Sequence, residues 1–599
     1  MVRGYCMNYP VWYIPEVGGG LLIAVIAIIH VFISHFAVGG GLYLVIAERK
    51  GLREKNRAIL DFTRSHAKFF LLMTMVAGGV TGVAIWFVIS LVQPAATSLL
   101  IHIFVFGWAT EWVFFLVEIV AIFVYFYTFG RMDDRTHQAV GWIYFIAAWL
   151  SLLLINGIIN FMLSPGAWLE NDSFWSAFFN PLFWPSLFFR TAVSCMLAGV
   201  YAFLTSAFLK DAAVKQTMTR FSAKWVLGSY LAAIPCGIWY YASVPPPARA
   251  LIAGASPTIQ RTLHAGFWAL IALAVLTLVL VILRPAFHSR PVAMFVFISA
   301  FIFMGAFEWT REAARRPYVI NEVMYSNGIL KAEMAGLKQN GFLRSARWVQ
   351  QKDLHEESLL DAGRELFVNQ CYACHTIGGI NNDILARTKT MSYPAILSYL
   401  GTIHDKRYFM PPFAGNEAEA RALAAFIVKG LQGKTITEGG APGGSKGQAL
   451  FDANCTACHG QDIIRSLTTG WERARVRKGL NRLSALNPAM PDYQGTPAEK
   501  EALADFIVSL NSPQPAAPAK GHDHGEDVFE QNCSMCHTLR DGGNPLLPKV
   551  AGWDQQRIRK TLDILDTLKG SIMPPLKASP ADKDALAAFL ASSSKGGAE

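Results

Sequence analysis

The sequence predicts an all-α protein: an eight-span transmembrane helical bundle followed by three small all-α domains. Two observations predict this division. Long apolar runs recur from about Gly19 to Phe307, whereas the chain after about Arg311 is charged and rich in Gly and Pro. The second half also repeats one residue pattern three times, as expected of small repeated domains. The predicted domains are residues 1–325, 357–433, 445–511 and 522–599.

Eight apolar runs are long enough to cross a membrane, because about 20 apolar residues span roughly 30 Å of hydrocarbon. They lie near residues 19–46, 67–93, 99–129, 138–164, 183–209, 225–243, 262–283 and 291–309. An even number of spans places both ends of the chain on one side. Met1–Val17 lacks the features of a cleavable signal peptide, so the first span is expected to direct export.

Basic residues gather in alternate loops between the spans. They are Arg49, Lys50, Arg53, Lys55, Arg57 and Arg64, then Arg131 and Arg135, then Lys210, Lys215, Arg220 and Lys224, then Arg284 and Arg290. By the positive-inside rule these loops are cytoplasmic, which predicts a multi-pass protein of the bacterial inner membrane with its second half in the periplasm. Because topology accounts for much of the formal +10 charge, nucleic acid is not an expected partner.

Three Cys-x-x-Cys-His motifs contain six of the nine cysteines. They are Cys371-Tyr372-Ala373-Cys374-His375, Cys455-Thr456-Ala457-Cys458-His459 and Cys533-Ser534-Met535-Cys536-His537. Cysteines three apart share a helix face and can form thioethers to one haem, while the adjacent His binds its iron. A zinc or redox pair would explain one Cys-x-x-Cys but not three copies with a following His. We therefore expect three covalent haem c groups. Cys6, Cys195 and Cys236 are scattered and imply no disulfide framework.

The repeat extends well beyond the cysteines. Each copy has Gly eight residues and Phe four residues before the first Cys, and each closes with Ala-Leu-Ala-x-Phe, which predicts a helix packed on the Cys helix. Between them lies Met beside Pro, at Met410, Met490 and Met573. Met is often core filler, but its recurrence at one position favours a second axial ligand presented by a stiff loop. These modules resemble class I cytochrome c domains over nearly all of residues 357–599.

Two segments between the modules have the composition of tethers. Lys434–Lys446 is rich in Gly, and Ser512–Lys520 is rich in Pro and Ala. His522 and His524 follow the second tether, where a weak metal site and a solvated linker are both open.

Ionisable residues inside membrane spans are functional candidates by default. Here they are His30, His35, His102, Glu111, Glu118, Arg190, His264, Glu308 and Arg311. Most lie in the outer half of the membrane, on the side of the haem domains.

Helical spacing separates these candidates. Glu111 and Glu118 are seven apart and return to within about 20°, as a proton relay or a ligand pair requires. His30 and His35 point about 140° apart and cannot serve the same side of one iron. We predict His30 as the haem ligand, and leave His35 between a second site and a packing hydrogen bond.

Other polar residues have two interpretations each. His66 is expected at the cytoplasmic interface, and His102 is a ligand or an interfacial residue. Asn156 and Asn160 share a face and must hydrogen-bond inside the bundle, for structure or for function.

Several motifs recur in a characteristic order along the spans. His30 is followed by Gly39-Gly40-Gly41 and Glu48, then Gly79-Val80-Thr81-Gly82, then Glu111 with Phe114-Phe115 and Glu118, and finally Glu308 to Pro317-Tyr318. In this order residues 15–325 resemble subunit I of cytochrome bd quinol oxidases. The resemblance implies that His30 ligates a high-spin haem at an oxygen-reducing site, and that Glu308 lies where the family places the carboxylate ligand of a neighbouring high-spin haem. It also implies that Glu111 and Glu118 carry protons, that the bundle holds one or two haem b or haem d groups, and that a second membrane subunit of the subunit II kind is a partner.

The chain also departs from the family. Arg190 and Leu263 stand at the positions that correspond to the His and Met ligands of its low-spin haem, so that haem is lost or rebuilt with the adjacent His264. The long quinol-binding loop is replaced by Ser243–Gln260, and the family's last span by the haem extension. The usual quinol site is therefore in doubt.

Both halves together predict a membrane-bound electron-transfer oxidoreductase. Electrons would pass between a periplasmic cytochrome c, or another soluble carrier, and the bundle haems, where O2 or NO is reduced. The alternative is a quinol:cytochrome c oxidoreductase or an electron conduit, with quinol as a donor and no CO-reactive haem. A sensor or scaffold would need no haem sites, which makes it the weakest interpretation.

Overall fold

The computed structural model describes residues 9–279, 285–389, 391–436, 445–455, 461–486, 492–511, 524–526, 528–529, 533, 546–565, 576 and 578–595. These residues form helices apart from one two-stranded antiparallel sheet, β1 (Tyr318–Ile320) and β2 (Met324–Tyr325). The predicted all-α class is confirmed. The chain divides into two compact units, Met1–Leu510 and Asn511–Glu599.

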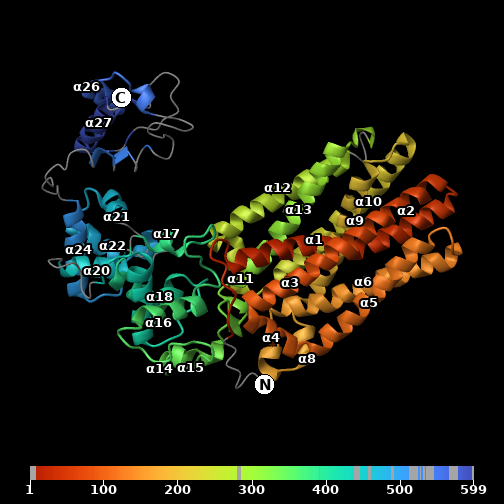
Figure 1. Ribbon diagram of the computed structural model, residues 1–599, viewed down its shortest axis with the longest axis horizontal. Coiled ribbons are helices and arrows are strands. Elements are labelled where there is room, and N and C mark those ends of the chain that lie inside the picture. The colour runs from red at the N-terminus through yellow and green to blue at the C-terminus, as the bar shows by residue number, and fades with distance from the viewer. Residues whose placement is uncertain are drawn as a thin grey trace. The chain divides into compact units, whose positions relative to one another are not determined.

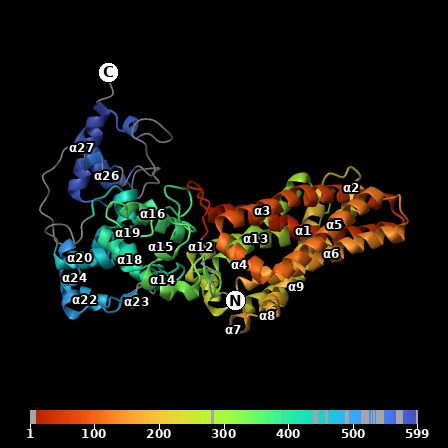
Figure 2. The ribbon, with the colours of Figure 1, turned by 60° about the horizontal axis from the view of Figure 1, so that its bottom comes forward.

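The membrane part is a bundle of long helices that lie side by side (Figures 1 and 2). Its helices are α1 (Gly19–Arg53), α2 (Arg57–Leu71), α3 (Gly79–Val92), α4 (Pro94–Ile103), α5 (Val105–Thr128), α6 (Asp134–Phe161), α9 (Phe183–Ser206), α10 (Ala212–Ser243), α12 (Pro257–Leu278) and α13 (Arg290–Ala313). A π-helical segment, η1 (Leu72–Gly78), joins α2 to α3 into one span. Short elements complete this part: α7 (Trp168–Asn171), α8 (Phe174–Phe178), α11 (Pro246–Ala250), η2 (Leu251–Ala255) and η4 (Pro285–Phe287).

Seven described helices are long and apolar enough to cross a membrane by themselves. The remaining predicted span, residues 225–243, lies within α10. This 32-residue helix contains Pro235 and packs along α9. The predicted spans therefore fall mainly on long helices of the bundle, but residues 99–103 belong to the short helix α4 and residues 280–283 lie outside the described residues.

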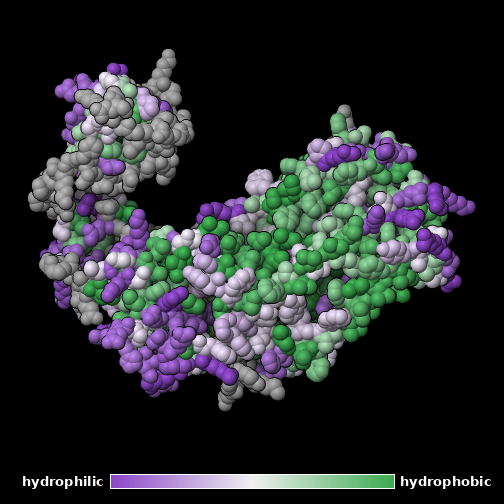
Figure 3. Space-filling view, viewed as in Figure 1, coloured by the Kyte–Doolittle hydropathy of each residue, from purple (hydrophilic) through white to green (hydrophobic). Residues whose placement is uncertain are grey.

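The surface of the bundle is that of a membrane protein. Hydrophobic residues cover its side in Figure 3, and hydrophilic residues gather at the end where α1 meets α2. Large apolar side chains are exposed on α3, α5 and α12, for example Val83, Phe106 and Trp268. Exposed apolar side chains over this area are expected where lipid is the solvent.

Glycines in α1 allow its neighbours to approach closely. A Cβ at Gly39 would overlap the backbone of Ser194 in α9, and one at Gly41 would overlap the ring of Tyr144 in α6. The predicted Gly39-Gly40-Gly41 motif is thus a packing device that sets α1 at the centre of the bundle.

The soluble part of the first unit follows α13. The β-hairpin leads to η5 (Lys331–Glu333), α14 (Met334–Asn340) and α15 (Phe342–Ser345). Next come α16 (Leu359–Gln370), α17 (Ile384–Thr388), α18 (Tyr393–Lys406), α19 (Glu417–Ala425) and η6 (Phe426–Leu431). The following domain contains α20 (Lys446–Asn454), α21 (Gln461–Thr468), α22 (Arg473–Leu480), α23 (Leu483–Leu486) and α24 (Pro497–Leu510). The second unit contains η7 (Leu547–Lys549), α26 (Gln555–Asp563) and α27 (Pro580–Lys595).

One helix crossing recurs in all three domains. A Cβ at Gly363, Gly447 or Gly525 would overlap the carbonyl oxygen of the first Ala in the Ala-Leu-Ala-x-Phe segment of the closing helix, at Ala422, Ala502 and Ala585 respectively. The Phe of each Cys helix lies near the Phe of each closing helix, with ring centroids 5.9, 5.3 and 6.4 Å apart. The predicted packing of the two helices is confirmed, and Gly is required because the helix backbones touch.

Candidate functional site

The first Cys-x-x-Cys-His motif continues the turns of α16. The backbone N–H of Cys371 donates to Phe367, and those of Cys374 and His375 donate to Cys371 at 3.1 and 3.0 Å. The motif therefore follows the helix rather than lying inside it, but its helical turn keeps the two cysteines near one face. The second and third motifs start with the same hydrogen bond. The backbone N–H of Cys455 and that of Cys533 each donate at 2.8 Å to the carbonyl oxygen of the Phe four residues earlier.

His375 is prepared as an iron ligand. Its Nδ1 lies 3.1 Å from the carbonyl oxygen of Asn382. A carbonyl only accepts, so Nδ1–H donates and the lone pair is on Nε2, as second-shell bonding commonly arranges for metal-binding His. Burial lowers the pKa of His375 to about 4, which keeps the ring neutral. The donor set of the first motif thus fits a c-type haem.

The predicted Met ligands are only partly described. Met410 follows α18, and its carbonyl accepts a 2.7 Å hydrogen bond from Nδ1 of His404. Cys458, His459, Met490, Cys536, His537 and Met573 lie outside the described residues.

The first motif lies directly against the end of the bundle. The ring of Tyr372 is 4.4 Å from that of Tyr13, centroid to centroid, and its hydroxyl accepts from the backbone of Ile14. Arg316, three residues beyond α13, donates to Sγ of Cys374 at 2.6 Å. These contacts join the first motif to the segment before α1 and to the segment after α13.

A second set of contacts extends this junction. The backbone N–H of Ile380 donates to Glu16 at 2.8 Å. A Cβ at Gly379 would overlap the carbonyl oxygens of Pro15 and Glu16. Backbone therefore meets backbone across the junction, which holds the first haem domain on the bundle.

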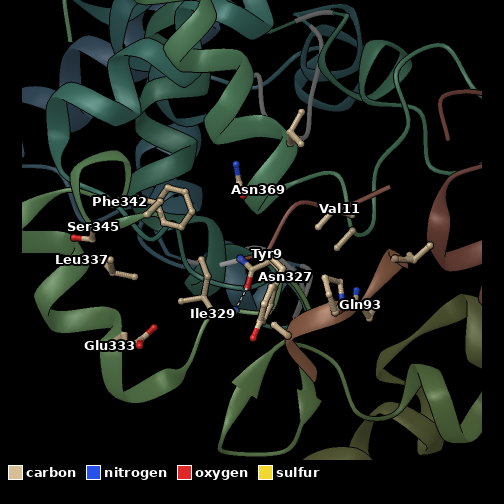
Figure 4. Close-up of a pocket in the computed structure, with 17 residues that line it drawn as sticks. Tyr9, Val11, Gln93, Asn327, Ile329, Glu333, Leu337, Phe342, Ser345 and Asn369 are labelled. Carbon is tan, nitrogen blue, oxygen red and sulfur yellow. Dashed lines mark hydrogen bonds between the residues drawn. The ribbon is translucent and has the colours of Figure 1, made fainter. Parts of the chain in front are cut away.

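A small cavity lies beside this junction (Figure 4). In Figure 4, Val11 and Gln93 line one side, and Leu337 and Phe342 line the other. Asn369, next to the first motif, also faces it. Its volume of about 50 Å³ is too small for a haem.

His30 is the predicted ligand in the bundle, and its surroundings agree with that role. Its Nδ1 lies 3.1 Å from Oγ1 of Thr81 in α3. Thr81 donates its own hydrogen to the carbonyl of Ala77 at 2.7 Å, so Nδ1–H of His30 is the donor and Nε2 keeps a lone pair for iron. Gly82 lies against the ring, where a Cβ would come within 3.2 Å. These features fit a His ligand of a haem.

Glu308 lies in a buried ion cluster. Its Oε1 is 3.0 Å from Nη2 of Arg190, and its Oε2 is 2.9 Å from Nε of Arg311. Arg190 also donates to Nε2 of His35 at 3.2 Å, and His35 donates from Nδ1 to Val31 at 2.8 Å. His35 therefore has the packing hydrogen bond that the sequence left open. To bind iron, Glu308 would have to release one arginine, and its ligand role stays a prediction.

The other histidines differ in exposure. His264 is exposed on α12, so a haem that it bound would lie on the outer face of the bundle. His102 is exposed on α4 and bonds to the carbonyl of Ser98. His66 is buried, with Nδ1 2.9 Å from Oγ1 of Thr205, a structural contact between α2 and α9.

Glu111 and Glu118 lie on the face of α5 that meets α6. Oγ of Ser151 in α6 donates to Glu111 at 2.9 Å, and Glu118 is buried two turns further along α5. The two carboxyl groups therefore lie along one face of α5, and the relay between them stays a prediction. Asn156 and Asn160 instead bond to Phe183 and Ser186 of α9, which makes them structural contacts.

Sequence reasoning missed a buried triad at the opposite end of the bundle. Glu48 accepts from the hydroxyl of Tyr125 at 2.9 Å and lies 2.7 Å from Nδ1 of His137. All three side chains are buried. A signal was available, because His137, Tyr144 and Ser151 are polar residues at seven-residue intervals along α6.

Two family models match this chain. The model for cytochrome bd terminal oxidase subunit I matches residues 21–242. The model for cytochrome c oxidase, cbb3-type, subunit III matches three segments, residues 358–427, 443–507 and 521–590. Glu308 and His264 lie beyond the matched part of the bundle.

Solved structures add a distant similarity. A chain of the bd oxidase from Geobacillus thermodenitrificans aligns with 17% sequence identity and a TM-score of 0.45, covering 51% of this chain and 90% of that one. No curated protein matches this chain.

The two families account for both halves of the molecule. Cytochrome c domains bind covalent haem c, and a bd-type domain binds haem b or haem d. Seven apolar helices place the first half in a membrane. The chain therefore unites a membrane domain similar to cytochrome bd terminal oxidase subunit I with three cytochrome c domains, and is a membrane-bound electron-transfer oxidoreductase.

Proposed function

We propose that this protein is a bd-type cytochrome c oxidase. It would take electrons from a periplasmic cytochrome c and reduce O2 in the bundle. The balanced reaction is four ferrocytochrome c, one O2 and four protons giving four ferricytochrome c and two water molecules.

The contact between the first haem motif and the bundle carries this proposal. Cys374 touches Arg316 beyond α13, and Tyr372 touches the segment before α1. A domain that only received electrons from distant partners would not need its haem-binding turn at this surface. The arrangement suits electron transfer between the first haem c and a haem in the bundle.

The residues of the chain would divide the work. A bound haem supplies the electron transfer and the binding of a small acceptor. Cys371, Cys374, His375 and Met410 would hold the first haem c, and the two later motifs would hold the others. His30 would hold a haem in the bundle, oriented by Thr81, while Glu111 and Glu118 would hold and move protons.

Orientation and partners belong to the same proposal. The basic loops mark the cytoplasmic end, which puts the haem c domains in the periplasm of a bacterial inner membrane. Exposed apolar side chains on α3 and α5, such as Val83 and Trp112, suit lipid or a second membrane subunit.

Difference spectra of the purified protein test the proposal. We expect c-type haem bands together with a b- or d-type haem that binds CO, and O2 uptake with reduced cytochrome c. Replacing His30 by Ala should abolish the CO signal and leave the c bands. A protein that contains only haem c would refute the proposal.

The same preparation separates the other candidates. Quinol-driven reduction of the haem c groups without a CO-reactive haem would indicate a quinol:cytochrome c oxidoreductase. Consumption of NO in preference to O2 would change the acceptor but keep the direction of electron flow.

A further inference from the structure

Polar residues form a ladder between α5 and α6. On α5, Glu111, Glu118 and Tyr125 are spaced by seven residues, and on α6, His137, Tyr144 and Ser151 have the same spacing. Residues seven apart on a helix return to within about 20°. The two helices are antiparallel neighbours, so the stripes meet in three successive pairs.

Two of these pairs are in direct contact. The rings of Tyr125 and His137 stack with centroids 4.3 Å apart. Tyr144 and Glu118 are both buried, and the hydroxyl of Tyr144 donates at 3.2 Å to the carbonyl oxygen of Ala37 in α1. Ser151 donates to Glu111. A single polar track therefore follows the α5–α6 interface for about 21 Å, the rise of fourteen helical residues.

The pair at the α1–α2 end of the bundle, Tyr125 and His137, also contacts Glu48 of α1. Glu48 and His137 share one proton. Nε2 of His137 lies 2.8 Å from the carbonyl oxygen of Tyr125, so Nε2 carries a hydrogen. Nδ1 lies 2.7 Å from Oε1 of Glu48. That contact needs one hydrogen, on either the imidazole or the carboxyl group. The pair is neutral in both arrangements, which allows burial, and the proton can change sides without a change in net charge.

The triad lies at the end of the bundle with the basic loops. Glu48 is five residues from the end of α1, and His137 is three residues after the start of α6, next to the loop that contains Arg131. This is the end opposite the first haem domain, and by the positive-inside rule it faces the cytoplasm.

The far end of the ladder reaches the depth of His30. The rings of Trp86 in α3 and Trp108 in α5 lie 4.8 Å apart. Gly82, which touches His30, is one turn from Trp86 in α3, and Glu111 is three residues from Trp108. Glu111 and His30 therefore lie at similar depths below the first haem c domain.

We infer that Glu48, His137, Tyr125 and Tyr144 form the cytoplasmic proton-uptake half of a track that delivers protons through Glu118 and Glu111 toward the site of His30. This inference rests on the proposed function, because reduction of O2 consumes protons. Adjacent rungs are about 10.5 Å apart along the helices, so water molecules between them complete the hydrogen-bonded chain.

The triad could instead serve only to hold the helices together. The variants below separate this structural role from proton transfer. His137→Gln retains hydrogen-bonding groups but cannot exchange a proton at physiological pH. His137→Ala leaves a space that added imidazole can fill. His66→Gln is the matched control, because His66 is also a buried His bonded across helices near the same end but lies off the ladder.

The experiment measures three rates in the purified full-length protein. These are O2 uptake with reduced cytochrome c, reduction of the haem c groups in stopped flow, and proton uptake after reduction, followed with a pH dye. CO-difference spectra report the bundle haem.

For Glu48→Gln and His137→Gln we expect O2 uptake and proton uptake to fall by about 100-fold, the low end of the contribution of a positioned proton-transfer group. Haem c reduction and the CO spectrum should stay unchanged. Imidazole should restore the rate of His137→Ala, and His66→Gln should resemble the wild type.

Three results would overturn the inference: O2 uptake within twofold of wild type, loss of the CO signal in every triad variant, or no rescue of His137→Ala by imidazole. Failure of the proposed function has a different signature, because the wild type itself would then show no CO-binding haem. Proton uptake on reduction still tests the ladder when the acceptor is not O2.

Discussion

At the scale of single residues, the hydroxyl of Thr81 accepts from Nδ1–H of His30 and leaves Nε2 as the nitrogen that would bind iron in the proposed site. Thr81→Val removes the acceptor for Nδ1–H and frees the ring to rotate or change tautomer. Loss of such a partner typically lowers metal-site affinity or activity by about 10–100-fold. We expect a smaller CO-difference signal per mole of protein, with the haem c bands unchanged.

Thr110→Val is the control for this variant. Thr110 is exposed on α5 and bonds within its own helix to the carbonyl of Phe106. An equal loss of CO signal in both variants would show that Thr81 acts through general stability and not through His30.

Glu308 balances two buried arginines. Glu308→Gln keeps the shape of the side chain but leaves Arg190 and Arg311 without their counter-charge, and breaking a buried ion pair typically costs about 3–5 kcal/mol. We expect a clearly lower thermal unfolding temperature in detergent. Glu54→Gln at the surface pair with Lys50 should change stability by less than about 1 kcal/mol. Unchanged stability of Glu308→Gln, accompanied by loss of a haem, would instead favour the predicted ligand role.

At the scale of elements, the crossing of two helices defines each haem c domain. Gly363→Ala would push the new methyl group into the carbonyl of Ala422 and the Cβ of Phe426. Overpacking of this kind typically costs about 1–3 kcal/mol. We expect a lower unfolding temperature of the first haem c domain, measured by loss of its absorbance bands on heating.

Gly401→Ala in the same domain is the matched control, since nothing lies within 4 Å of its Cβ position in α18. It should be neutral or slightly stabilising, because Ala favours helix over Gly. Equal losses in the two variants would contradict the role of the crossing.

The α5–α6 pair illustrates what helix periodicity can and cannot reveal. The spacing of Glu111 and Glu118 predicted a shared face, and Ser151 of α6 donates to Glu111 while Glu118 is buried. The sequence does not single out Tyr144 and Ser151, because neutral polar residues are common in membrane helices. The periodicity of one helix also does not show which helix packs against it. Only the packing of α5 against α6 brings the polar residues of the two helices together at one interface.

At the scale of the whole molecule, the first haem domain shares a compact unit with the bundle, and the third belongs to a separate unit. A chain that ends at Leu510 should therefore fold and retain the membrane haem. We expect the pyridine haemochrome assay to give two haem c groups per chain in place of three, with the CO spectrum unchanged.

The full-length Cys533→Ser/Cys536→Ser variant is the control for this truncation, because it removes the same haem attachment without removing the domain. Loss of the CO-binding haem in the truncated chain would show that the third domain contributes to the bundle site.

The sequence by itself determined the architecture: apolar runs of membrane length, three Cys-x-x-Cys-His motifs and the Gly and Phe positions of each haem c domain. These signals are local or strictly periodic, so no knowledge of the neighbouring helices is needed to read them. Tertiary structure alone decided which candidates act together. Glu308 meets Arg190 across 118 positions of sequence, Glu48 meets His137 across 89, and Cys374 meets Arg316 at the domain junction. The reason is physical, because the strength of a hydrogen bond or ion pair depends on distance and burial, and these are set only when the helices pack.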